Sequence, residues 1–494
     1  MKLPMRHAPF LFFDRLFKRR LVAIAVCTLL ANGCAVGPDY QRPSAATSEA
    51  YKEAQGQDWV PAAPADALER GPWWQLFDDP VLNELTARID VSNQNVAAAT
   101  AAYAQARALV RQQRASLFPE VTLDAGATRS GGGAGATTDT GIVGSSTSGT
   151  RSSGKYQASI GASWEPDVWG RLRRGVDSAS ASSQASAADL ASARLSAQGE
   201  LAVDYFSLRQ TDAQQALTAV TIAGYQRSLQ IAQNRYAAGI AAKTDVLQAQ
   251  TQLANAQADE LSLVRQRAKF EHAIAVLVGE APANFVLAAA PWKATVPEIP
   301  LGVPSTLLQR RPDIAGAERR VAAANEQIGI AQSGFYPSLT LNASAGSSAS
   351  RVADLFSASS SFWSLGLSAA QVLFNAGATR AKVSGAQAAH DAAVAHYRQA
   401  VLTAFQDVED QLAATRVLHQ QQELRQQASQ AADQAEAQML NRYRAGQVIY
   451  TEVVTAQATA SSARRALVQL QADRQTTAVA LIQSLGGGWL ADVK

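Results

Sequence analysis

A single cysteine near the amino terminus is the residue whose surroundings most clearly predict a chemical reaction. Cys34 follows the stretch Ala31-Asn32-Gly33, which is itself preceded by basic residues and a short apolar segment at about 21–30. This segment is shorter than the roughly 20 residues that span a bilayer and matches an export signal. A cysteine at the cleavage position predicts acylation of its thiol. The alternative is an ordinary signal peptide with a chance cysteine.

The residue after the cysteine indicates where the anchored chain is expected to reside. Ala35 takes this place, whereas bacterial lipoproteins held at the inner membrane commonly carry an aspartate there. Two preceding positions depart from the usual pattern, because Ala31 replaces the commoner leucine and Asn32 is bulkier than usual. We expect diacylglycerol and covalent acyl chains on Cys34, sorting to the outer membrane, and no other cofactor.

No other set of residues has the spacing of a catalytic or metal site. The second cysteine, Cys27, lies inside the predicted signal, so the mature chain has neither a disulfide nor a thiolate metal site. The histidines of the mature chain lack the i, i+4 spacing of a zinc site such as H-E-x-x-H. They are His272, His390, His396 and His419. The sequence therefore predicts a protein that is not an enzyme and binds no metal.

The charge of the mature chain argues against nucleic-acid binding. The signal contains six of the 44 Lys and Arg residues and one of the 41 Asp and Glu residues, which leaves 38 basic and 40 acidic side chains. A nearly neutral chain lacks the basic footprint of a nucleic-acid-binding protein. No apolar run after Cys34 is long enough for a transmembrane helix. A mature chain that crosses a membrane must therefore do so as a β-barrel.

An internal duplication organises the rest of the chain. The stretch 234–239, Asn-Arg-Tyr-Ala-Ala-Gly, recurs at 441–446 as Asn-Arg-Tyr-Arg-Ala-Gly, and Thr244 and Val246 recur at the same spacing as Thr451 and Val453. The period is far longer than the 20–50 residues of solenoid repeats, so one large unit is duplicated.

Each half of the duplication predicts the same order of elements. A helix at about 79–116, or at 306–333 in the second half, ends at a proline, and two strands and a long helical hairpin follow. The expected divisions are a signal peptide (1–33), an acylated extended arm (34–72), a first repeat (73–280), an inter-repeat linker (281–304), a second repeat (305–488) and a C-terminal tail (489–494).

Four segments alternate apolar and polar residues with the period of two that indicates a strand with one apolar face. They lie at 121–128, 156–165, 338–345 and 363–369. Strands of about 10 residues, apolar outside and polar inside, are typical of transmembrane barrels. The Gly/Ser/Thr-rich loop 131–155 would then be extracellular. A soluble sheet with one wet face is the alternative, and the acyl anchor and flanking helices favour the barrel.

The helical hairpins are unusually long. The stretches 171–236 and 378–443 contain no strong helix breaker, and a helix of this length measures on the order of 100 Å. A seam with 3–4 spacing predicts coiled-coil packing, and it comprises Val394, Tyr397, Val401, Ala404, Val408, Leu412 and Thr415. Such helices could serve as a spacer that reaches inward from the outer membrane, or as a merely structural coiled coil.

The number of strands requires more than one chain. Four strands cannot close a barrel, because the smallest bacterial barrels have eight. Two copies would give eight strands, whose interior side chains nearly fill the barrel, and three copies would give twelve and leave room for a conduit. The strand count favours three copies only weakly.

Several motifs together resemble the TolC-like outer-membrane efflux family, in its lipoprotein (NodT) branch. They are Cys34-Ala35-Val36-Gly37-Pro38-Asp39-Tyr40, Trp73-Trp74, Trp164-Glu165-Pro166-Asp167-Val168-Trp169-Gly170, Arg310-Arg311-Pro312-Asp313-Ile314 and Phe335-Tyr336-Pro337-Ser338-Leu339. One departure is Val372-Leu373-Phe374-Asn375, where the family usually has a proline before Leu-Phe and an aspartate in place of Asn375. The strand-to-helix junction there is therefore less securely predicted.

The resemblance implies an α+β membrane protein. The expected assembly is a homotrimer with a twelve-stranded transmembrane β-barrel, four strands per chain, continued by a long periplasmic α-helical coiled-coil barrel. The expected function is the outer-membrane exit duct of a tripartite efflux pump for drugs or other small toxic molecules. The implied partners are a periplasmic adapter, an inner-membrane RND-type pump and outer-membrane lipid. The alternatives are the outer-membrane component of a type I protein secretion system and a structural or adapter lipoprotein of the periplasm.

The resemblance also implies a periplasmic gate at the second-repeat turn. Glu452 matches the first of two acidic family positions, whereas Thr455 occupies the second, so one acidic ring is expected. Three converging carboxylates repel each other, which favours proton and cation binding. Tyr443, preceded by Arg442, matches a family tyrosine that ties the inner helix pair to its neighbours. The matching first-repeat residues, Tyr236 and Asp245, would lie on the outer pair. The alternative role of Glu452 is a solvated helix-start residue favoured by the helix dipole.

Overall fold

The computed structural model describes residues 35–45, 51–53, 72–131, 152–297 and 311–487. The chain forms two compact units, and each unit collects segments from both halves of the duplication. Unit 1 comprises Met1–Arg42, Ala106–Ser183 and Arg320–Ala393, and unit 2 comprises Pro43–Gln105, Gln184–Arg319 and Val394–Lys494. The compact units therefore cut across the sequence repeats.

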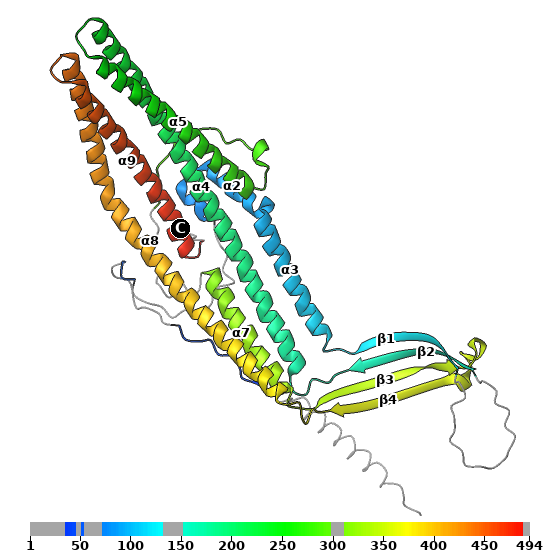
Figure 1. Cartoon of the computed structure of the whole chain (residues 1–494). Coiled ribbons are helices and arrows are strands. Elements are labelled where there is room, and N and C mark those ends of the chain that lie inside the picture. The colour runs from blue at the N-terminus through cyan, green and yellow to red at the C-terminus, as the bar shows by residue number, and fades with distance from the viewer. Residues whose placement is uncertain (1–34, 46–50, 54–71, 132–151, 298–310, 488–494) are drawn as a thin grey trace, which may run out of the picture. The chain divides into compact units, whose positions relative to one another are not determined.

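The two halves contain the same order of helices and strands, which confirms the duplication (Figure 1). The first half contains η1 (Trp73–Phe77), α2 (Pro80–Ser92), α3 (Gln94–Ala115), β1 (Glu120–Gly131), β2 (Ser152–Trp164), α4 (Arg171–Ala237) and α5 (Lys243–Leu277). A short η2 (Pro282–Asn284) lies in the inter-repeat linker. The second half contains α7 (Pro312–Ser333), β3 (Ser338–Ala349), η3 (Val352–Asp354), η4 (Ala358–Ser360), β4 (Ser361–Ala370), α8 (Ala378–Arg444) and α9 (Tyr450–Ser484).

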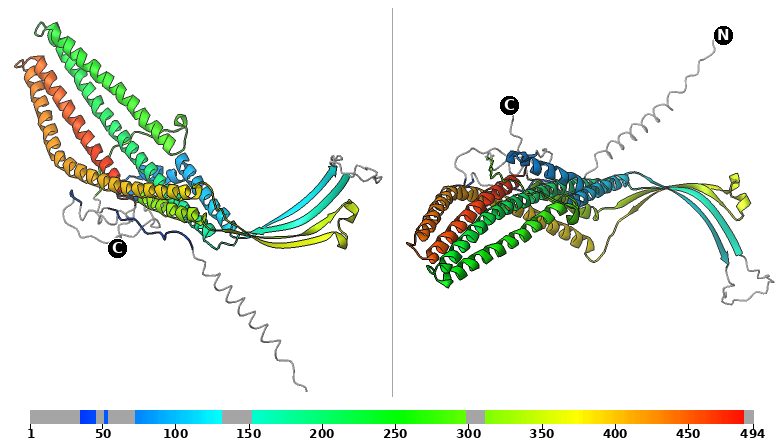
Figure 2. Two further views of the ribbon diagram at one scale, coloured as in Figure 1. Left: turned by 60° about the horizontal axis from the view of Figure 1, so that its bottom comes forward. Right: turned by 90° about the horizontal axis from the view of Figure 1, so that it is seen from above.

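The four strands form one antiparallel sheet in unit 1, in the order β1-β2-β3-β4 (Figure 2). One row across the sheet joins Leu123, Ile160, Ala345 and Trp363, and the neighbouring row, on the opposite face, joins Thr122, Gly161, Ser344 and Ser364. The predicted alternation is confirmed, because one face is apolar and the other polar. Within the described residues, the outer edges of β1 and β4 have no strand partner.

The strands are longer than predicted, at 12, 13, 12 and 10 residues. The expected loop 131–155 was too long, because β1 continues to Gly131 and β2 already begins at Ser152. Glycine and serine are poor strand formers by propensity, but here the ladder pairs Gly131 with Ser152 and Arg129 with Gly154. Pairing with a neighbouring strand overrides the local preference.

The single helix predicted at 79–116 was wrong, because it is divided at Asn93 into α2 and α3. The backbone of Asn93 is extended. Its side-chain oxygen accepts hydrogen bonds from the amides of Asn95 (3.0 Å) and Val96 (3.1 Å), and its amide nitrogen donates to the Leu277 carbonyl at 2.8 Å. A buried asparagine thus caps α3 and ties it to the end of α5.

Unit 2 contains the hydrophobic core that holds the helical hairpins together. Trp73 and Phe77 of η1 and Ile89 of α2 pack with buried residues of α4, α5 and α9, including Phe206, whose ring centroid lies 4.9 Å from that of Phe77. Asp79 caps α2 through the amides of residues 81 and 82 and also accepts a hydrogen bond from the Tyr205 hydroxyl at 2.7 Å. None of the described helices combines the length and hydropathy needed to cross a bilayer.

The predicted seam of α8 is mostly confirmed. Tyr397, Val401, Ala404, Val408 and Leu412 are buried. Thr415 was predicted to continue the seam but is exposed, and its hydroxyl donates to the Gln411 carbonyl at 2.8 Å. The apolar stripe therefore ends at Leu412.

The described parts of the amino-terminal arm contain no helix or strand and are held by hydrogen bonds to the rest of the chain. In unit 1, the Val36 amide donates to the Trp169 carbonyl at 3.1 Å, and Arg174 donates to the Pro38 carbonyl at 3.2 Å. In unit 2, the Glu409 carboxylate accepts hydrogen bonds from the amides of Lys52 (2.7 Å) and Glu53 (3.1 Å). The arm is thus fixed in both units by hydrogen bonds to its backbone.

Candidate functional site

The two turns that join the long helices have the same backbone geometry. Gly239 and Gly446 follow α4 and α8 with φ values of 72° and 75°, a left-handed conformation that glycine adopts without strain. The amide of the next residue donates back to Arg235 in the first turn and to Arg442 in the second, each at 2.9 Å. This is the Schellman termination, which explains why glycine and the residues before it recur in both halves.

A small buried cluster in unit 2 joins the two hairpins beside these turns. It contains Ala232 of α4, Ala249 of α5, Tyr443 of α8, and Tyr450 and Val453 of α9. The Tyr443 and Tyr450 rings lie 5.3 Å apart between centroids at an angle of 57°. All four long helices therefore contribute to one contact region.

Arg235 makes the most specific contact between the hairpins. Its guanidinium carbon lies 4.7 Å from the centre of the Tyr443 ring, and its Nη1 donates to the Tyr443 carbonyl at 2.9 Å. A cation over an aromatic ring is attracted by the electron-rich face of the ring. Arg235 thereby holds α4 of the first hairpin against the end of α8 in the second.

The two tyrosine hydroxyls in this cluster are neutral. Burial raises the pKa of Tyr443, and the nearby Asp245 raises it further against the opposing effect of Arg235. Burial likewise raises the pKa of Tyr450 to about 12. The Tyr443 hydroxyl has no hydrogen-bond partner in the described part of the chain, whereas the Tyr450 hydroxyl interacts with Ser228. Contact with Arg235 is therefore made by the Tyr443 ring and carbonyl.

Asp245 and Glu452 occupy the same place in their hairpins. Each is the third residue of its helix, α5 or α9, where the positive end of the helix dipole favours a carboxylate. Glu452 is exposed, and no described cation pairs with it. Thr455 is exposed one turn further along α9, and its hydroxyl donates to the Thr451 carbonyl at 3.0 Å.

The predicted gate residues thus differ in their environment. Tyr443 is 2% exposed, whereas Tyr236 is 48% exposed and Arg442 is also exposed. The charge of Asp245 acts on Tyr443, whereas Glu452 is exposed and precedes Val453 of the cluster. Cys34 lies outside the described residues.

Arg235 was not among the residues singled out from the sequence. The repeat did contain a signal for it, because Arg235 is the counterpart of Arg442 in the duplicated Asn-Arg-Tyr stretch. The two arginines are not equivalent within one chain. Only Arg235 lies over a tyrosine, and that tyrosine belongs to the other half of the duplication.

The motif at 164–170 forms the joint between β2 and α4 in unit 1. Asp167 caps α4 by accepting hydrogen bonds from the amides of Leu172 (3.0 Å) and Arg173 (2.8 Å). The Trp164 indole donates to the Leu117 carbonyl at 2.9 Å, and the Trp169 indole donates to the Pro337 carbonyl at 2.8 Å. The two tryptophans fix the start of α4 against the segments that precede β1 and β3.

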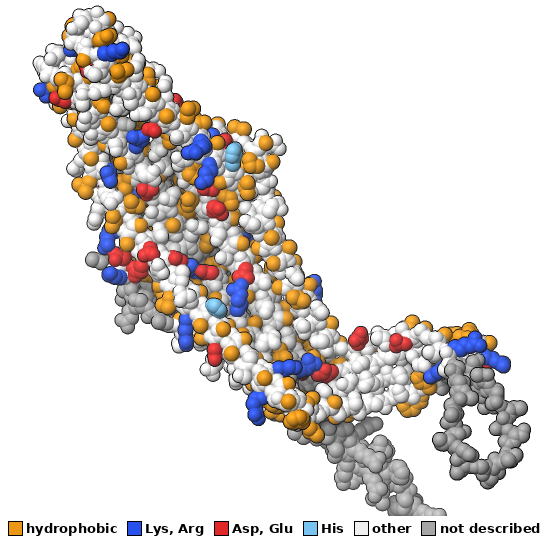
Figure 3. Space-filling view, viewed as in Figure 1, with side chains coloured by type: hydrophobic (Ala, Val, Ile, Leu, Met, Phe, Trp, Pro, Cys, Tyr) orange, Lys and Arg blue, Asp and Glu red, His pale blue; other side chains and the backbone are white. Residues whose placement is uncertain are grey.

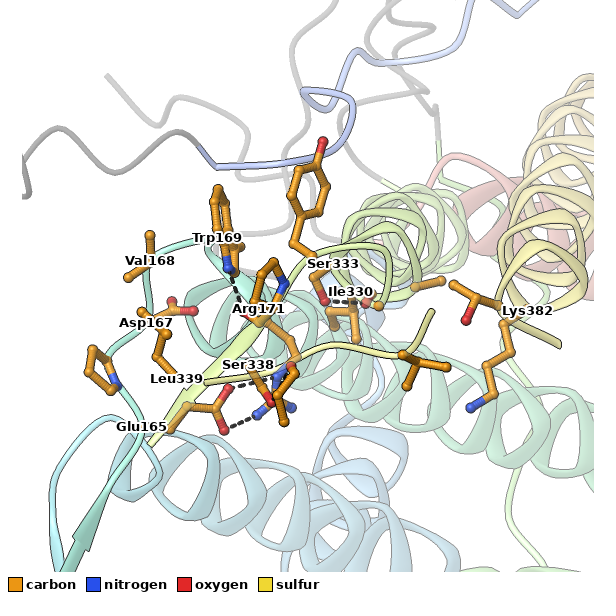
Figure 4. A pocket seen from close by; sticks show the side chains of 18 of the residues that line it. Glu165, Asp167, Val168, Trp169, Arg171, Ile330, Ser333, Ser338, Leu339 and Lys382 are labelled. Carbon is orange, nitrogen blue, oxygen red and sulfur yellow. Dashed lines mark hydrogen bonds and ion pairs between the residues drawn. The ribbon is translucent and has the colours of Figure 1, made fainter. Parts of the chain in front are cut away.

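A cavity of about 620 Å³ lies at this joint. Figure 4 shows Trp169 and Val168 on one side and Lys382 on the other, with the ion pair between Glu165 and Arg171 on the wall. The Trp169 ring stacks on Tyr336 at 4.8 Å. The ion pair and the stacked rings hold the joint between β2 and α4 in place.

The junction before α8 lacks an equivalent cap. The Asn375 side chain donates to the Thr379 hydroxyl at 2.7 Å, and Ala376 adopts a φ of 50°, which is unfavourable for a residue with a Cβ. Leu373 and Phe374 are 91% and 87% exposed. The departure from the family motif therefore coincides with an exposed turn.

Within the described residues no group of three or more His, Cys, Asp or Glu side chains could hold a metal ion. The Nδ1 atom of His390 lies 3.4 Å from the carboxylate of the neighbouring Asp391.

Comparison with known proteins agrees with this architecture. The outer membrane efflux protein family matches residues 86–280 and 303–487. The chain is 32% identical over 478 residues to the probable efflux pump outer membrane protein TtgC of Pseudomonas putida, covering 95% of this chain and 96% of that protein. It is 34% identical over 441 residues to the pyoverdine export outer membrane protein OpmQ of Pseudomonas aeruginosa, covering 88% and 91%.

Solved structures show the same fold. The outer-membrane channel OprN superposes with a TM-score of 0.82 at 31% identity, covering 92% of this chain and all of that one. The outer membrane protein VceC of Vibrio cholerae gives 0.75 at 27% identity, covering 85% of this chain and all of that one.

Two long helical hairpins and a two-faced sheet, together with these similarities, define an outer-membrane channel protein. The chain belongs to the outer membrane efflux protein family and serves as an outer-membrane efflux duct.

Proposed function

We propose that three copies of the chain close their sheets into one twelve-stranded barrel that lets small molecules leave the periplasm passively. The observation that carries this proposal is the sheet of unit 1, which has one apolar face, one polar face and two unpaired edges within the described residues. Unpaired strand edges are costly in a lipid environment, and closure removes them. Pairing β4 of one chain with β1 of the next satisfies both edges at once.

The proposed duct is the outer-membrane part of a tripartite pump. A periplasmic adapter and an inner-membrane RND-type pump would supply selectivity and energy, and acyl groups on Cys34 would anchor the chain to the outer membrane. The relatives named for antibiotic efflux and pyoverdine export support small molecules as the cargo. No observation favours type I protein secretion, and the family membership removes the adapter alternative.

The helix turns of unit 2 would form the gate of this duct. In the closed state Arg235 holds the two hairpins of one chain together through Tyr443. The duplication allows the same contact between chains, with Arg442 of one chain lying over Tyr236 of the next. This arrangement explains why both residues are exposed in the single chain. The Glu452 side chains of the three chains would form a ring of carboxylates around the threefold axis.

The proposed assembly predicts a trimer in detergent. Native mass spectrometry of the purified mature protein should give three times the mass of one acylated chain, because twelve strands leave room for a conduit. A dimer would instead indicate an eight-stranded barrel, and a conducting monomer would contradict a barrel shared between chains.

The proposed anchor predicts that Cys34 incorporates fatty acid. Labelled palmitate should appear in the wild-type protein and be lost in Cys34→Ser, because the thiol is the acceptor. Cys27→Ser is the matched control, since it changes the only other cysteine of the sequence. The Cys27→Ser protein should still incorporate palmitate. Equal labelling of the wild type and Cys34→Ser would refute the anchor.

A further inference from the structure

The apolar face of the sheet ends in a row that carries positive charge. On this face Leu123 pairs with Ile160 and Ala127 pairs with Tyr156, and the next row toward the loops pairs Arg129 with Gly154. Aromatic residues at the border of an apolar band are typical of a membrane interface. Arg129 therefore lies in the first row beyond the apolar band.

A second arginine belongs to the same row. The pairing of β2 with β3 ends at Tyr156 and Ala349. Continued for two more residues, the same register would bring Gly154 opposite Arg351. The backbone of Arg351 is extended (φ −132°, ψ 145°), and a Cβ on Gly154 would lie 3.7 Å from the Ser350 carbonyl oxygen, which agrees with this register. The two arginines thus flank a glycine, separated by two strand spacings of ~4.8 Å each.

Gly154 leaves a gap between these arginines. A Cβ there would meet only ordinary contacts, at 3.7 Å from the Ser350 carbonyl and 3.8 Å from the Tyr156 ring. The Tyr156 ring therefore borders this gap, and Arg129 and Arg351 are both exposed residues. Arg129 also interacts elsewhere in the chain, but a guanidinium has five N–H donors and can serve two partners.

Charge on this end of the sheet is distributed unevenly. Basic side chains gather at the loop end in Figure 3. The described strand residues of the apolar face include no carboxylate, because Glu120 and Asp124 alternate onto the opposite, polar face. Asp354 is the one acid between β3 and β4, three residues beyond Arg351. The arginine row thus places positively charged side chains next to apolar surface.

We propose that Arg129, Gly154 and Arg351 bind the phosphate of a phosphorylated glycolipid in the outer leaflet, with its acyl chains on the apolar face below. This inference rests on the proposed function, which turns that face toward lipid. Guanidinium groups match phosphate oxygens in charge and in bidentate geometry. An arginine that merely extended its side chain toward water would attract anions in general, without a specific site for phosphate.

The test compares two lipids on the full-length acylated protein. Native mass spectrometry would measure retention of lipid A with both phosphates and of chemically dephosphorylated lipid A. We expect the wild type to retain the phosphorylated lipid about tenfold more strongly, and Arg129→Gln combined with Arg351→Gln to abolish this preference. Equal retention of both lipids by the wild type, or an unchanged preference in the double variant, would overturn the proposal.

Two further variants leave both arginines in place. Gly154→Asp should abolish the preference, because a carboxylate would occupy the gap, whereas Gly154→Ala should retain it. Lys155→Gln is a matched control, since Lys155 pairs with Thr128 on the opposite face and its removal should change nothing. A preference that is lost equally in Lys155→Gln, or fully competed by inorganic phosphate, would show general anion attraction and contradict a lipid site.

The same preparations separate this inference from the proposed function. Channel conductance in planar bilayers should be the same for the wild type and the double arginine variant. Conductance without any phosphate preference would refute the lipid site alone. Folded protein that neither conducts nor distinguishes the two lipids would refute the proposed duct as well.

Discussion

Glu452→Gln is expected to lower the preference of the open channel for cations over anions by roughly fivefold. In the proposed trimer this change would remove three carboxylates from the proposed gate, where each would act at short range on a passing ion. Since Thr455 replaces the second acidic position, no neighbouring carboxylate layer compensates for the loss. Reversal potentials in a salt gradient across a planar bilayer measure the change directly.

Two further variants test whether the effect on ion selectivity depends on the position of the carboxylate. Asp245→Asn removes a carboxylate from the same position of the first hairpin, and it should alter selectivity much less than Glu452→Gln. Thr455→Glu adds a carboxylate one turn away from Glu452 and should increase cation preference. An unchanged reversal potential in Glu452→Gln would mean that Glu452 only stabilises the start of α9.

Arg235→Met is expected to raise the fraction of time that the channel is open at least ~tenfold. The substitution keeps most of the apolar side chain but removes the cation above the Tyr443 ring and the donor to the Tyr443 carbonyl. Each of three chains loses one contact of the closed state, so the effects accumulate in the trimer. Single-channel recording at low voltage provides the measurement.

The controls for this experiment lie on the same helices. Arg227→Met changes an exposed arginine two turns earlier in α4 and should leave opening unchanged. Tyr443→Phe should have a smaller effect than Arg235→Met, because the ring and the carbonyl remain and the hydroxyl has no partner among the described residues. A rise in opening in Arg442→Met would support the repeated contact between chains. Normal opening in Arg235→Met would contradict the proposed gate.

The bounds of the long helices could be predicted closely, because the residues that end each helix are neighbours in the sequence. The helices α4 and α8 end just before Gly239 and Gly446, and α5 and α9 begin a few residues after them. The glycine-dependent Schellman turns at these ends need only neighbouring residues. The strands were also predicted in type and face. The predicted strands were too short at the ends near the loops, since those Gly- and Ser-rich ends are held by the neighbouring strand.

The features that were missed depend on distant residues. The break at Asn93 is stabilised by the Leu277 carbonyl, which lies 184 residues away in sequence. The contact of Arg235 with Tyr443 spans 208 residues and joins the two halves of the duplication. Local patterns carry no information about which half of a repeat will pack against the other. Such contacts require the tertiary arrangement.

Planar-bilayer recording from purified wild-type trimers tests the proposed duct most directly. We expect cation-selective current steps from a channel that is mostly closed, and current steps of the same size with longer openings in Arg235→Met. Folded trimers that conduct no ions in either form, or that conduct anions in preference to cations, would contradict a duct gated at the helix turns of unit 2.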